Sequence, residues 1–213
     1  MKKLSLILAL CMLLTLTGCS QPQQAQIAAT TLPVYEFTAR LCAGTGISVA
    51  RLVTESVSCL HDYSLNVRQV KALESAELVV ISGAGMEEFM EDLLQGRNII
   101  DASAGISLIE PEEHHHDHEH EHEEESHEGH HHEEDPHIWL SPANAMAMAQ
   151  NICNGLTVQY PTFADTFSAN LEVLIAEMEA LADYGEQTLA DLSCRELITF
   201  HDGFSYLAES FHL

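Results

Sequence analysis

Short apolar runs alternate with stretches of helical periodicity along the first half of the chain. The runs are rich in β-branched residues, and apolar residues at helical spacing separate them. Strands are predicted at 27–32, 47–53, 78–82 and 98–101, and helices from the first strand to about residue 42, at 66–75 and at 86–95. This order favours a parallel sheet with helices on both faces.

A second block of helical sequence lies in the C-terminal half. Ser141 and Pro142 form a helix start, with serine as N-cap and proline at the first helical position, and this helix stops before Pro161. The longest helix is predicted at 163–192. It would be about 45 Å long, enough to connect two lobes rigidly. A strand at 195–200 and a helix at 202–211 follow.

The predicted fold class is therefore α/β. We expect a parallel-sheet N-terminal lobe with flanking helices at 27–160, a long rigid connecting helix at 161–192 and the start of a second α/β lobe at 193–213. A lobe of one strand and one helix cannot build its own sheet or core. We therefore expect the chain to be truncated in its second lobe; the alternative is a naturally short protein.

The amino terminus has the pattern of a bacterial lipoprotein leader. Two lysines precede an apolar run of 13 residues, which is shorter than the roughly 20 residues that a membrane-spanning helix needs. The run ends in Leu-Thr-Gly-Cys, which predicts a signal peptide at 1–19, lipidation of Cys19 and a polar tether at 20–26. The protein would then be extracytoplasmic and lipid-anchored to the cell envelope membrane. A buried apolar helix is the alternative.

Composition and charge narrow the range of partners. The chain carries 33 acidic against 8 basic residues, a net charge of −25, and 46% of its residues are hydrophobic. A nucleic-acid partner is excluded because such binding depends on basic side chains that neutralise phosphates. An acidic surface attracts cations, although solubility explains it equally well.

Much of the acidity lies in one histidine-rich segment, 112–134. It has no apolar periodicity and little hydrophobic surface, so a mobile loop is predicted. Its imidazoles give low-affinity metal binding, which would serve as a scavenger, a sensor or a shuttle, or would be adventitious. These accessory ligands are His114, His115, His116, His118, His120, His122, His127, His130, His131 and His132.

Other signals are weak. Apart from Cys19, the mature chain would hold Cys42, Cys59, Cys153 and Cys194, for which three disulfide pairings are possible and none is favoured. No C-x-x-C, G-x-S-x-G or H-E-x-x-H motif occurs, so the commonest thiolate zinc, hydrolase and metalloprotease signatures are absent. The sequence therefore does not predict an enzyme.

Three histidines outside the loop are the candidate metal ligands. His61 follows the second predicted strand, His137 lies between a proline turn and a capped helix, and His201 ends the apolar run Glu-Leu-Ile-Thr-Phe. Open α/β sheets place ligand sites at the carboxyl ends of their strands, and imidazole suits Zn²⁺. For any one of them, a hydrogen-bonded loop residue is the alternative.

The segments around these histidines are similar to those of one family. Leu-His-Asp-Tyr at 60–63, Asp-Pro-His-Ile-Trp-Leu-Ser-Pro at 135–142 and Thr-Phe-His-Asp-Gly-Phe-Ser-Tyr-Leu at 199–207 resemble the ligand segments of the zinc- and manganese-specific substrate-binding lipoproteins of ABC transporters, cluster A-I. An acidic histidine-rich loop is typical of the zinc-importing members. Ser-Cys-Leu before His61 departs from the Pro- or Gly-containing turn that the family more often has.

The resemblance implies a function and a ligand set. Members hold the metal between two lobes with three histidines and usually a carboxylate; here His61, His137 and His201 match, and the carboxylate would lie beyond Leu213. It implies a monomeric, non-catalytic protein that captures Zn²⁺, possibly Mn²⁺, and delivers it to an ABC permease. Asp62 and Asp202 would orient ligands or begin helices. The alternative function is a surface metal buffer or adhesin-like protein that acts through its histidine-rich loop.

Overall fold

The computed structural model describes residues 25–54, 63–109, 135–201 and 203–213. Several predicted features lie outside these ranges and are not described: the leader with Cys19, Cys59, His61, Asp62, the histidine-rich segment 112–134 and Asp202.

A four-stranded parallel sheet forms the centre of the molecule, as predicted. Its order is β2-β1-β3-β4, and all neighbouring strands run parallel. The strands are β1 (Ile27–Ala29), β2 (Val49–Arg51), β3 (Leu78–Ile81) and β4 (Ile99–Asp101). In register, Ala28 lies between Ala50 and Val79. The central strand β1 is completely buried, which agrees with helices covering both faces of a parallel sheet.

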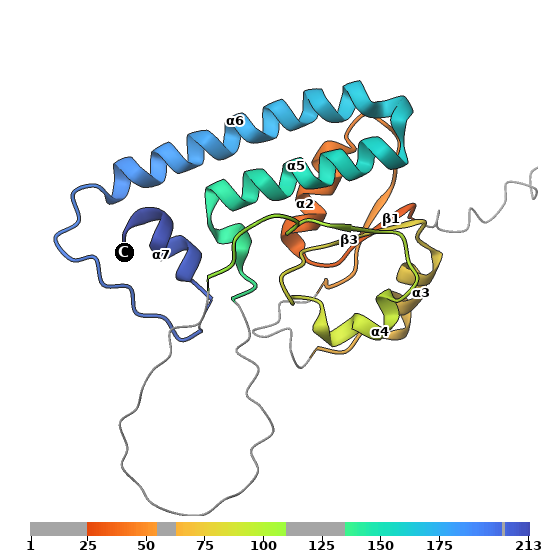
Figure 1. Cartoon of the computed structure of the whole chain (residues 1–213), viewed down its shortest axis with the longest axis horizontal. Coiled ribbons are helices and arrows are strands. Elements are labelled where there is room, and N and C mark those ends of the chain that lie inside the picture. The colour runs from red at the N-terminus through yellow and green to blue at the C-terminus, as the bar shows by residue number, and fades with distance from the viewer. Residues whose placement is uncertain (1–24, 55–62, 110–134, 202) are drawn as a thin grey trace, which may run out of the picture.

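Two helical layers cover the sheet (Figure 1). On one face lie α2 (Leu32–Leu41), α5 (Pro142–Gln159) and α6 (Ala164–Leu189). On the other lie α3 (Val67–Ser75) and the short α4 (Glu91–Leu94). Strand alternation divides the core accordingly: Ile27 packs with the first layer, whereas the next residue, Ala28, packs with Leu73 of α3. The predicted helices on both faces are therefore confirmed.

Local capping fixes where two of these helices begin. The Ser141 hydroxyl accepts a hydrogen bond from the Asn144 backbone amide, and Pro142 is the first residue of α5, as the sequence predicts. Asn66 caps α3 in a reciprocal arrangement with Gln69. Later in α5, Gly155 lies against Ile100 of β4, and a Cβ there would be 2.5 Å from the Ile100 Cγ1 atom. Glycine therefore allows α5 to lie close to the sheet edge.

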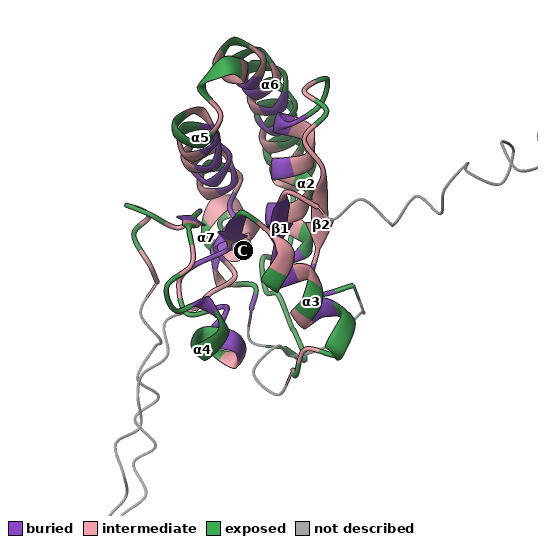
Figure 2. Ribbon diagram, turned by 90° about the vertical axis from the view of Figure 1, so that its right-hand side faces the viewer, coloured by how far each residue is buried: buried purple, intermediate pink, exposed green. Residues whose placement is uncertain are grey.

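Helix α6 divides into a buried and an exposed half. Phe167, Leu171, Leu174 and Met178 face the core between α2 and α5, but Leu181 and Tyr184 further along are more than 60% exposed. Figure 2 shows the buried surfaces of α2, α5 and α6 facing one another. Within the described ranges, no helix combines the length and apolar character needed to cross a membrane.

The predicted helix at 86–95 is confirmed only in shortened form. A 3₁₀ turn at Glu88–Met90 and the four-residue α4 take its place. The reason is Glu87, which is buried instead of pointing outward from a helix. Its carboxylate accepts hydrogen bonds from the backbone amides of Ser82 and Gly83 and from the Thr30 hydroxyl. This closes the loop after β3 on itself and delays the start of the helix.

The predicted strand at 195–200 is wrong. These residues form an irregular, exposed segment, in which Ile198 and Phe200 show more than 85% of their surface. A strand needs a neighbour to receive its main-chain hydrogen bonds, and no described segment pairs with this one. The final helix is confirmed in shortened form as α7 (Ser205–Phe211).

Three cysteines fall within the described residues, and each is a free thiol. Cys42 and Cys153 are buried in the main core, where burial raises the pKa of the Cys42 thiol to about 12. Both thus behave as small apolar core residues.

Candidate metal centre

The position of His137 is set by the turn that leads into α5. Ile138 directly after it is fully buried, and a 3₁₀ turn, Ile138–Leu140, connects it to the Ser141 cap. The His137 side chain remains 16% exposed, with its ring centroid 5.3 Å from that of Trp139. The buried neighbour fixes the backbone, so the imidazole lies at the surface in a defined place.

Asp135 orients the His137 ring. One carboxylate oxygen, Oδ1, is 2.7 Å from Nδ1 of His137 and also accepts a hydrogen bond of 2.9 Å from the His137 backbone amide. Burial alone would raise the pKa of Asp135, but the hydrogen bonds and charge of His137 outweigh it, so this pKa is lowered. An ionised Asp135 accepts a hydrogen bond from Nδ1–H of His137, which leaves the Nε2 lone pair free for a metal.

Asp135 is a residue of the candidate site that the sequence interpretation missed. That interpretation assigned an orienting function to Asp62 and Asp202, which follow histidines and lie outside the described residues. The signal was present in Asp-Pro-His itself, because an aspartate two residues before a backbone amide can accept its hydrogen bond through a short local turn.

His201 meets His137 across a separation of 64 residues. The two Nε2 atoms are 3.1 Å apart, and the rings are nearly perpendicular with centroids 4.9 Å apart. Two nitrogens bound to one Zn²⁺ at about 2.0–2.1 Å in tetrahedral geometry lie about 3.3 Å apart. The pair therefore has the spacing of two ligands of one ion, although His201 does not end a strand as expected.

Comparison with known proteins identifies the family. The family model described as "Zinc-uptake complex component A periplasmic" (ZnuA) matches residues 27–213, nearly all of the chain. The chain belongs to the ZnuA family. This confirms the resemblance predicted from the histidine segments, and the family is one of metal-binding transport components and not of enzymes.

Two curated relatives of the ZnuA family are similar over most of this chain. The zinc-binding lipoprotein AdcA of Streptococcus pneumoniae serotype 4 is 33% identical over 222 residues, covering 100% of this chain and 43% of AdcA. The high-affinity zinc uptake system protein ZnuA of Bacillus subtilis is 34% identical over 200 residues, and the match covers 91% of this chain and 60% of that protein. The chain thus spans less than half the length of AdcA.

Solved structures of the ZnuA family share the fold. A crystal structure of ZnuA superposes with a TM-score of 0.74 at 30% identity, over 89% of this chain and 69% of that one. Zn(II)-bound AdcA from Streptococcus pneumoniae gives 0.71 at 28% identity, over 89% of this chain and 38% of AdcA. The α/β fold class with its long helix is therefore confirmed.

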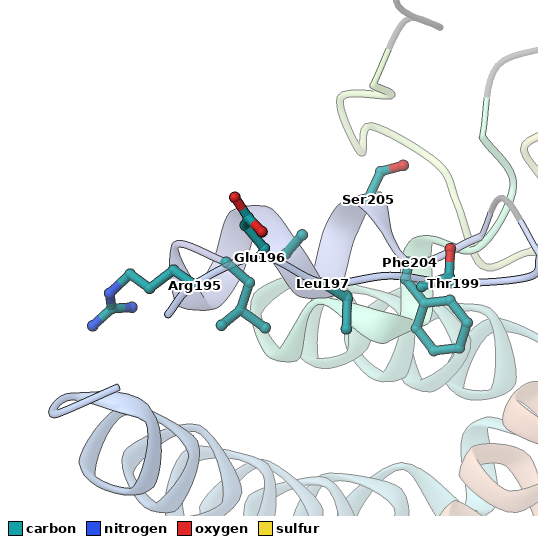
Figure 3. A pocket seen from close by; sticks show the side chains of 8 residues that line it. Arg195, Glu196, Leu197, Thr199, Phe204 and Ser205 are labelled. Atoms are coloured by element: carbon teal, nitrogen blue, oxygen red, sulfur yellow. The ribbon is translucent and has the colours of Figure 1, made fainter. Parts of the chain in front are cut away.

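The described residues assemble two of the three predicted ZnuA-type ligands. His137 and His201 come together, whereas His61 lies outside the described ranges. Within those ranges no group of three His, Cys, Asp or Glu side chains surrounds a single point. An open hollow of about 440 Å³ lies nearby between Leu197 and α7 (Figure 3), but neither histidine lines it. It is thus separate from the histidine pair.

Gly203 packs against both imidazoles of the histidine pair. A Cβ at this position would lie 2.8 Å from Cε1 and 2.9 Å from Nδ1 of His137, and 2.9 Å from Cδ2 of His201. Its φ is outside the left-handed region, so the requirement for glycine is steric. Only a residue without a side chain lets the two rings approach, which the sequence motif did not reveal.

Gly203→Ala should therefore weaken metal binding without unfolding the protein. The added methyl group displaces one or both rings, and disturbed ligand orientation in metal sites costs about 10–100-fold in affinity. Zinc affinity measured by chelator competition should fall by this factor, while the melting temperature of the metal-free protein changes little. Unchanged affinity would show that the rings are free to move aside.

Proposed function

We propose that this chain captures Zn²⁺ outside the cytoplasm and delivers it to an ABC permease, without catalysis. The observation that supports this best is the 3.1 Å separation of the two Nε2 atoms, with the other nitrogen of His137 held by Asp135. The names of the relatives, zinc-binding lipoprotein and zinc uptake system protein, agree with it.

His61 is the proposed third ligand, and Cys19 the proposed lipidation site. A neutral imidazole set favours Zn²⁺ over Mn²⁺, because Mn²⁺ prefers oxygen ligands. In this proposal the 27–160 lobe and the first half of α6 carry His137 rigidly, and 193–213 begins the second lobe. Because protonated imidazole cannot bind metal, the ion is released as pH falls.

Replacing residues 112–134 with a short Gly-Ser linker tests this proposal. If His137 and His201 form the site, the shortened protein retains one tight Zn²⁺ site in calorimetric titration and loses the weaker sites of the histidine-rich segment. The contrary result, weak multiple binding in the intact protein that disappears with the segment, would indicate the surface metal buffer instead.

A further inference from the structure

The hydroxyl of Tyr206 joins three parts of the chain next to the histidine pair. It accepts a hydrogen bond of 3.0 Å from the backbone amide of Ile109 and donates one of 3.1 Å to the backbone carbonyl of Asp135. Tyr206 is only 2% exposed, so these bonds are shielded from water. Ile109 and Asp135 are the described residues on either side of segment 110–134, and one oxygen atom thus holds both.

Asp135 connects this hydroxyl to the site. Its carbonyl is held by Tyr206, and its carboxylate holds Nδ1 of His137. On the other side, Tyr206 belongs to α7, which begins shortly after His201 and Gly203. Tyr206 therefore contacts the chain that leads into His137, and it belongs to the helix that follows His201.

Helix α7 is itself fixed to the end of α6. The guanidinium of Arg195 donates to the carbonyls of Leu189 and Ala190 at the end of α6 and to those of Phe211 and His212 at the end of α7. Gly185 of α6 makes room for the ring of Phe211, because a Cβ there would lie 2.4 Å from Phe211 Cε1. Figure 1 shows α7 below the C-terminal end of α6 and beside the start of α5. Tyr206 is thus attached to a fixed element.

We propose that Tyr206 is a positioning residue of the histidine site, and that it acts by holding the chain on both sides of the histidine-rich segment together. This rests on the proposed function of His137 and His201. Without the hydroxyl, the backbones of Ile109 and Asp135 lose the hydrogen-bond partner that they share, and these bonds no longer offset the entropy of the long connection between them. Asp135 then loses its fixed position, and His137 loses the orientation that its Nε2 needs.

Tyr206→Phe tests the proposal, with Tyr160→Phe as the matched control. Among the described residues the Tyr160 hydroxyl is also buried but has no hydrogen-bond partner, so its removal deletes the same atom without breaking a bond. Orienting groups around metal ligands contribute about 10–100-fold to affinity, and Tyr206 acts one contact further away, so Tyr206→Phe should weaken Zn²⁺ binding by about 3–10-fold. Tyr160→Phe should leave the affinity unchanged.

Two further measurements distinguish positioning from general destabilisation. Exchange of the His137 Nδ1 proton with solvent, followed by NMR, should accelerate in Tyr206→Phe and not in Tyr160→Phe. In the protein with the Gly-Ser linker in place of 112–134, the short linker keeps the ends together, so Tyr206→Phe should cost clearly less affinity than in the intact protein.

The outcomes separate this inference from the proposed function. Suppose that His137→Ala abolishes tight binding. The positioning proposal is then overturned if Tyr206→Phe binds Zn²⁺ like the wild type, or if Tyr206→Phe loses as much affinity with the linker as without it. If His137→Ala leaves tight binding intact, the proposed function itself fails. A loss of affinity in Tyr206→Phe with unchanged Nδ1 exchange would also reject positioning.

Discussion

His137→Ala and His201→Ala should each weaken Zn²⁺ binding by at least about 100-fold. Structural zinc sites with four ligands are bound with about 10–16 kcal/mol, so one ligand contributes about 3 kcal/mol, and each 1.4 kcal/mol changes affinity tenfold. Both substitutions remove an Nε2 atom from a pair only 3.1 Å apart, so their effects should be similar. Competition with a chelator of known affinity measures the loss.

His212→Asn is the matched control for this prediction. His212 ends α7 with a left-handed backbone, φ 56°, which asparagine tolerates better than alanine, so the imidazole can be removed without added strain. Its substitution should leave the tight site intact. Equal losses in all three variants would mean that zinc binds to histidines in general and not to the proposed pair.

The second large effect is expected at Glu87, whose contribution to stability should fall as pH rises from 4.5 to 7. Burial raises the pKa of Glu87 from 4.5 to about 7, in spite of the hydrogen bonds from Thr30, Ser82 and Gly83, and nearby Asp101 raises it further. Between these pH values the folded protein keeps a proton that the unfolded chain releases. The folded state is therefore favoured at low pH, and about 3 kcal/mol is lost by pH 7.

Denaturant unfolding of the metal-free protein at several pH values measures this effect. Glu87→Gln cannot titrate, so the difference in unfolding free energy between wild type and Glu87→Gln should shrink by about 3 kcal/mol between pH 4.5 and 7. Carboxylates that do not interact with Glu87 contribute equally to both proteins and cancel. Glu88→Gln, at the exposed neighbouring position, serves as the control for the loss of a carboxylate that is not buried. A constant difference for Glu87→Gln would exclude a raised pKa.

Local sequence signals were enough to predict the sheet and its covering helices. The β-branched runs around Val79 and Ile100 became neighbouring parallel strands, and the Ser141-Pro142 pair began a helix where expected. These features depend on residues close in sequence, whose preferences agree with the fold. The helix predicted at 86–95 is shorter than expected and begins as a 3₁₀ turn, because the buried contacts of Glu87 override the helical pattern at its start.

The sequence pointed to the histidines of the candidate site, but not to the residues that contact them through space. His137 and His201 carry an unusual residue type in distinctive motifs, and the structure brings them together. Gly203 and Tyr206 are common residues, and only their contacts with the imidazoles and with Asp135 mark them. At 195–200 the sequence predicted a strand that the structure lacks, since an apolar run does not by itself supply a pairing partner.

The close packing of α5 against β4 has a consequence for how the two histidines differ. Gly155 lets α5 pack closely against Ile100, and the Asn151 side-chain amide donates hydrogen bonds to the carbonyls of Ala102 and Ala104. The helix that follows His137 is therefore fixed to the sheet edge. His201 instead follows an irregular, solvent-exposed segment. In the proposed site, His137 has therefore lost much of its conformational freedom before an ion arrives, whereas the exposed segment before His201 leaves more freedom to be lost on capture.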